Sequence, residues 1–100
     1  MSNITFQQIT TERNSRLMSW LADELELKEP ERWKLYAQMT LLFKHTTENE
    51  QAEYIVEKLS SKKIIQDLVF ARKAIKRFHD IAVGWLNDIA KESKNYGQTS

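Results

Sequence analysis

Two histidines, His45 and His79, are the side chains best suited to acid–base or metal chemistry in this sequence, which has no cysteine. Neither histidine has a second histidine at the i, i+4 spacing that helical metal sites use. Two glycines, Gly84 and Gly97, are too few for a loop that cradles phosphate. We therefore expect no metal, no cofactor and no enzyme active site. A buried cavity lined by His79 and carboxylates would reverse that expectation.

The basic residues give the strongest functional candidate. Between residues 58 and 77 the chain carries seven Lys and Arg residues and a single acid. This stretch contains two like-charged pairs at helical i, i+4 spacing, namely Arg72 with Lys76 and Lys73 with Arg77. Each such pair costs a helix about 0.2–0.5 kcal/mol, so an anion opposite this face would stabilise it.

Three sources could supply that anion. The first is the chain itself, because residues 1–57 have a net charge of −4 and residues 58–100 a net charge of +5. The second is an acidic protein partner and the third is nucleic acid. The isoelectric point near 8.0 is low for a nucleic-acid-binding domain, and the sequence shows no helix-turn-helix spacing with a turn glycine.

From these features we predict a partner-binding patch in which cations surround an aromatic side chain. Its residues are Lys63, Phe70, Arg72, Lys73, Lys76 and Arg77. Exposed apolar groups ringed by polar ones are typical of protein-binding surfaces. The expected function is therefore a non-enzymatic protein-binding module, such as a small adaptor, inhibitor or assembly subunit. A nucleic-acid-binding protein that uses the same basic face is the alternative.

Helices must position these residues, because two glycines and one proline are too few for the turns of a β fold. The first helix is expected from Thr10 or Thr11 to Leu27. Residues 1–9 are expected to form an arm that packs through Phe6 and Ile9, although Thr5-x-x-Gln8 also has the spacing of a helix-capping box.

Two further helices follow from local signals. Pro30 favours a helix start, which predicts a second helix from about Pro30 to Lys44. Thr47-x-x-Glu50 is a capping box, which predicts a third helix from about Glu48 to Leu59.

A long last helix is expected from Ser61 to Glu92, ahead of a frayed tail at 93–100. The apolar stripe of the third helix, centred at 55–56, lies half a turn out of phase with the stripe that starts at 64–65, because each residue turns about 100°. A break at Ser60–Ser61 would resolve this. The last stripe has heptad-like spacing through Ile64, Leu68, Ala71, Ile75, Phe78, Ala82, Trp85 and Ile89. We expect it to continue through Gly84.

The sequence thus predicts one all-α domain over residues 1–100, a small four-helix, mostly antiparallel bundle with a long C-terminal helix. Because that helix is longer than any single neighbour, either two helices placed end to end or a second copy of the chain could cover it. A homodimer through residues 61–92 is therefore a further expectation. No apolar run approaches the roughly 20 residues of a membrane span. The lack of cysteine and of a signal peptide leads us to expect a cytoplasmic protein without membrane partners.

Overall fold

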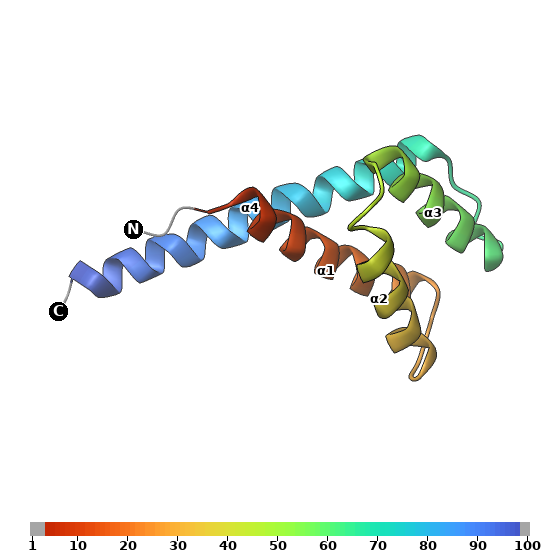
Figure 1. The fold of residues 1–100 in the computed structure, drawn as a ribbon, viewed down its shortest axis with the longest axis horizontal. Coiled ribbons are helices and arrows are strands. Elements are labelled where there is room, and N and C mark those ends of the chain that lie inside the picture. The colour runs from red at the N-terminus through yellow and green to blue at the C-terminus, as the bar shows by residue number, and fades with distance from the viewer. Residues whose placement is uncertain (1–3, 99–100) are drawn as a thin grey trace.

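The computed structural model describes the backbone of residues 4–98 and the side chains through Glu92. This part of the chain forms four helices and no strand: α1 (Phe6–Glu24), α2 (Glu31–Leu42), α3 (Glu48–Ser61) and α4 (Leu68–Gln98), as Figure 1 shows. The predicted fold class is confirmed, an all-α, mostly antiparallel four-helix bundle whose last helix is the longest.

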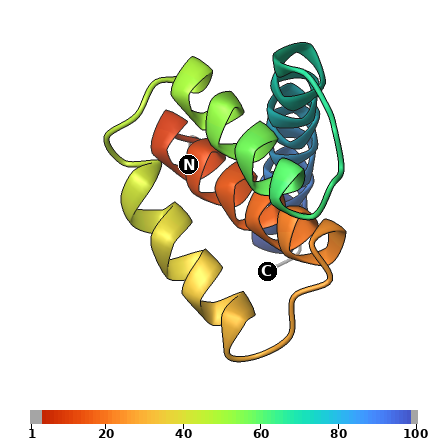
Figure 2. The ribbon, with the colours of Figure 1, turned by 90° about the vertical axis from the view of Figure 1, so that its right-hand side faces the viewer.

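Helix α1 lies at the centre of the packing. It contacts α2, α3 and, most extensively, α4, and α3 also packs on α4. Figure 2 shows α1 between α2 and α4 with α3 above it. The largest fully buried side chains come from all four helices: Leu17, Leu21, Met39, Ile55, Leu59 and Ile75. Burying each of these side chains contributes about 1.5–3 kcal/mol, which makes this core the main source of stability.

The start of α1 corrects the prediction of an N-terminal arm over residues 1–9. A capping box forms at Thr5, whose Oγ1 accepts a hydrogen bond from the Gln8 amide at 3.1 Å. Gln8 Oε1 accepts one from the Thr5 amide at 2.8 Å. These bonds satisfy two free amides, so the helix begins at Phe6. Phe6 is 76% exposed, so the expected packing of Phe6 was wrong. Residues 1–3 of the predicted arm lie outside the described residues.

The other end of α1 and the next two helices follow the expected order with shifted ends. Helix α1 ends at Glu24, three residues before Leu27, and Glu26 takes a left-handed φ of 54°. The predicted capping box at Thr47 is confirmed, with hydrogen bonds of 3.2 and 3.1 Å to Glu50. Gln51 is buried in the first turns of α3, and its Nε2 donates to the carbonyls of Phe43 and Thr46 at 3.5 and 3.3 Å. These bonds tie the α2–α3 turn to α3.

The predicted start of the last helix at Ser61 was wrong. Ser61 ends α3, and an irregular segment over residues 62–67 leads to α4, with Lys63 at a φ of 62°. Asp67 Oδ1 accepts a hydrogen bond from the Phe70 amide at 2.9 Å, which caps α4 and explains why it begins at Leu68. The phase argument for a break was sound, but the chain needs six residues rather than two to change direction.

Helix α4 continues through Gly84 as predicted, and it extends to Gln98, past the expected end at Glu92. Figure 1 shows its C-terminal end projecting beyond the other helices, and the longest dimension of the molecule is 54 Å. We call residues 68–82 the covered half and residues 83–98 the open half. In the open half Trp85 and Ile89 remain 44% and 39% exposed, whereas Ile75 in the covered half is 1% exposed.

Candidate partner-binding groove

An open groove of about 530 Å³ lies where α1, α3 and the covered half of α4 meet. Five of its lining residues are basic or histidine and one is acidic. The lining residues are Phe6, Arg13, Glu48, Val69, Arg72, Lys73, Ile75, Lys76 and His79. The groove therefore combines a cationic rim with apolar side chains, and we call it the basic groove.

The structure brings three of the predicted patch residues together in the basic groove. Arg72, Lys73 and Lys76 line it, and all three side chains are exposed. Arg77 is also exposed on α4 but does not line the groove, and Lys63 lies apart from it in the segment before α4. We call Arg72, Lys73, Lys76 and Arg77 the basic face of α4.

Phe70 has a different role from the one expected. It is partly buried and lies against Trp20 of α1, with ring centroids 6.1 Å apart. Trp20 also contacts Phe78, about two turns further along α4, with ring centroids 5.9 Å apart. Phe70 does not line the groove. It belongs to the aromatic packing between α1 and α4, on the flank of α4 away from Arg72 and Lys76.

The ion pairs of the described residues do not neutralise the basic face. They join Arg16 to Glu12, Arg32 to Asp23 and Lys34 to Glu31, all within the first half of the chain. Arg72 instead donates a hydrogen bond to the neutral side chain of Asn49. The acidic first half therefore supplies no ion pair to Arg72, Lys73, Lys76 or Arg77 in this part of the molecule.

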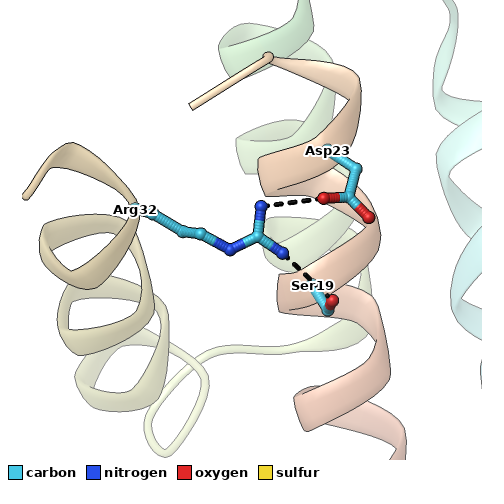
Figure 3. A network of polar contacts seen from close by, with 3 residues as sticks. All are labelled: Ser19, Asp23 and Arg32. Carbon is cyan, nitrogen blue, oxygen red and sulfur yellow. Dashed lines mark hydrogen bonds and ion pairs between the residues drawn. The ribbon is translucent and has the colours of Figure 1, made fainter. Parts of the chain in front are cut away.

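Some acidic residues of the first half of the chain form ion pairs with basic residues of that same half. Figure 3 shows Arg32 of α2 extending toward α1, where Nη1 donates to Asp23 Oδ1 at 2.7 Å and Nη2 to Ser19 Oγ at 3.3 Å. The hydrogen bond to Asp23 raises the pKa of the Arg32 guanidinium above its ordinary value. These bonds link α1 to α2, so Asp23 serves the fold rather than the basic face.

Arg13 is the groove residue that the sequence analysis missed. Its Nε and Nη2 both donate to Oδ1 of neighbouring Asn14, at 3.1 and 2.9 Å. Burial lowers the pKa of this guanidinium, while the charge of Glu48 acts in the opposite direction. No ion pair to Arg13 is found within the described residues. Arg13 gives no sequence signal, since only packing brings this residue of α1 beside α4.

The groove also contains His79, which is partly buried, and the acid Glu48. Within residues 4–98 no three His, Asp or Glu side chains gather into a group that could hold a metal ion. Nor is any helix of that range both long and apolar enough to cross a membrane. The arrangement can attract anions through its cations and accept an apolar group beside Val69.

No protein-family model, curated protein or solved structure matches this chain.

Proposed function

We propose that this chain is a non-enzymatic protein-binding module, such as a small adaptor, inhibitor or assembly subunit, that binds an acidic partner through the basic face of α4. One observation carries the proposal. Arg72, Lys73, Lys76 and Arg77 are all exposed, and none forms an ion pair within the described residues.

The repulsion along the basic face supports this proposal. Two like-charged i, i+4 pairs on the first turns of α4 cost folding free energy, and no acid of the described chain offsets them through an ion pair. A complementary acidic surface would remove that repulsion, speed association and favour the correct partner over neutral ones. The apolar side chain of Val69, which is 54% exposed beside Arg72 and Lys73, adds contact area that a purely ionic surface lacks.

Affinity capture from the native host tests the proposal, with the wild-type chain compared against a Lys73→Glu/Arg77→Glu variant. The expected result is a partner retained by the wild type and lost by the variant, because charge reversal turns attraction into repulsion. A Lys62→Glu/Lys91→Glu variant makes the same change of net charge outside the basic face and serves as the control. If the charge-reversed variant captures the same partners as the wild type, the basic face is not the binding surface.

The same four exposed cations also support nucleic-acid binding as the second candidate. Binding to phosphates weakens steeply as salt rises, because counterions are released from the nucleic acid. A mobility-shift titration at low salt distinguishes the two candidates. A salt-sensitive complex would favour nucleic acid, and the absence of any complex would remove this candidate.

We further propose a homodimer through exposed apolar side chains of α4 that run from the end of the covered half into the open half. Ile81, Trp85 and Ile89 recur every four residues and are 38–44% exposed, which leaves an apolar stripe on one side of the helix. Light scattering at increasing protein concentration is expected to show a dimer, and a monomer mass at high concentration would refute it. The cytoplasmic location expected from the composition stays a prediction.

A further inference from the structure

We propose that the basic groove binds an acidic peptide segment of the partner, with one carboxylate on Arg13 and an apolar side chain against Val69. This inference rests on the proposed function and names the chemistry of the partner at the site.

Arg13 is partly buried, whereas Arg72, the other arginine of the groove, is exposed. The Arg13 guanidinium is partly withdrawn from water, and its two assigned hydrogen bonds both go to the neutral Oδ1 of Asn14. A charged group that loses water is destabilised unless an opposite charge compensates it. The charge of Glu48 compensates Arg13 in part, but the two form no ion pair within the described residues. A carboxylate can accept two parallel N–H bonds from a guanidinium, which is the strongest pairing available to arginine. A peptide carboxylate at Arg13 would thus replace the hydrogen bonds to water that the guanidinium loses on burial.

The other side chains of the groove determine the sign of the ligand's charge. Arg72, Lys73 and Lys76 extend from α4 into the same groove that Arg13 enters from α1. Glu48 is the single acid among the lining residues. Cations from two helices around one concave surface attract an anion more strongly than a flat surface does, because the low-dielectric walls focus the field.

The apolar lining argues for a peptide rather than for a bare anion. Phe6 and Val69 are 76% and 54% exposed, and both line the groove beside the cations. An extended or helical peptide can present a leucine-like side chain between its carboxylates and cover these surfaces. The groove volume of about 530 Å³ lies within the range of roughly 300–1,000 Å³ that is usual for ligand-binding pockets.

Fluorescence anisotropy with a labelled peptide tests this inference directly. The probe is a short peptide of glutamates around a single leucine, and the purified full chain is the receptor. Arg13→Gln is expected to weaken binding about tenfold, which corresponds to the loss of one charge-assisted hydrogen bond. Arg13→Lys should weaken it less, because the charge remains while the planar fork is lost.

Matched variants separate a specific groove from general attraction. Lys91→Gln removes the same charge on the open half and should leave affinity within about twofold, because distant charges are screened. Glu48→Gln should strengthen binding, since it removes the acid of the groove. Replacing the peptide leucine by serine should weaken binding about fivefold through lost apolar contact. Circular dichroism of each variant establishes that it is folded.

Several outcomes would overturn the inference. They are equal losses for Arg13→Gln and Lys91→Gln, no peptide binding by the wild type at low salt, no effect of the leucine, or tighter binding of a single-stranded oligonucleotide of equal charge. If peptide binding is independent of Arg13 while partner capture still requires Lys73 and Arg77, the inference alone fails. If the peptide binds through Arg13 but the charge-reversed variant captures the same host proteins, the proposed function of the basic face fails instead.

Discussion

The covered and open halves of α4 have the same apolar spacing but different surroundings. In the covered half, Ala71 and Ile75 are almost fully buried against α1 and α3. In the open half, Trp85 and Ile89 occupy later positions of the same heptad-like series and remain more than a third exposed. A repeat of apolar residues therefore specifies which face of a helix is apolar, while the length of the neighbouring helices determines how much of that face is covered.

Hydrogen exchange should show the largest contrast between the two halves. Amides around Ile75 are expected to exchange only through global unfolding, because side chains from other helices pack over them. In the monomer, where no second copy covers the open half, amides around Ile89 should exchange through local fraying, with an opening free energy several kcal/mol smaller. The measurement is native-state exchange followed by NMR. Equal protection in both halves would mean that the open half has a partner in solution, and dilution would then abolish its protection.

Truncating one isoleucine in each half gives the next largest effect. Ile75→Ala should destabilise the chain by about 2–5 kcal/mol, because it removes a buried side chain and leaves a cavity. Ile89→Ala should cost less than about 1 kcal/mol, because that side chain is already 39% exposed. Urea denaturation at low protein concentration measures both. Comparable losses would contradict the distinction between the halves.

Gly84 offers a smaller test at the beginning of the open half. A Cβ added there meets nothing within 4 Å, and glycine within a helix is about 0.5–1 kcal/mol less favourable than alanine. Gly84→Ala should therefore stabilise the helix by up to that amount. Thermal unfolding and exchange of the nearby amides measure the gain. Asn87→Ala at an exposed position is the control and should stabilise the helix less, because asparagine is less unfavourable in a helix than glycine. A gain in local protection without a higher melting temperature would show that the open half unfolds separately.

Alkaline pH should affect the packing of α3 on α2, where Tyr54 lies against Phe43 and donates a hydrogen bond to Gln38 Oε1 at 2.7 Å. Burial raises the pKa of Tyr54 to about 12, and the charge of Glu57 adds to this effect. The unfolded chain releases this proton near pH 10, so the folded state binds it more tightly over about pH 10–12. Stability should fall as pH rises through this window. Tyr54→Phe should reduce the dependence of the free energy of unfolding on pH in this window, as measured by denaturation at several pH values. An unchanged dependence would rule out Tyr54 as its source.

Local signals predicted much of the fold. The Thr47 capping box depends on residues three apart, so its hydrogen bonds to Glu50 follow from sequence alone. The Thr5–Gln8 pair carried the same signal, yet the alternation of Ile4 and Phe6 led us to expect an arm. Asp67 is another local signal that would have placed the start of α4 correctly, since aspartate is a favoured N-cap.

The groove was only partly predictable, because it depends on packing between helices. Spacing along α4 identified Arg72, Lys73 and Lys76 as one basic region. It could not show that Arg13, about sixty residues away along the chain, enters the same groove. Nor could it show that Phe70 lies against Trp20, because a wide apolar arc does not reveal which part the neighbouring helix covers.

The three tryptophans have a practical consequence because each lies in a different environment. Trp20 is packed between Phe70 and Phe78, Trp33 is 56% exposed beside Tyr36, and Trp85 lies under the Arg16 guanidinium at 5.5 Å. Variants that retain a single tryptophan would differ in their wavelength of maximum fluorescence emission. That wavelength would be shortest for Trp20 and longest for Trp33. Intrinsic fluorescence would then report on the α1–α4 interface, on α2 and on the open half separately, without any added dye.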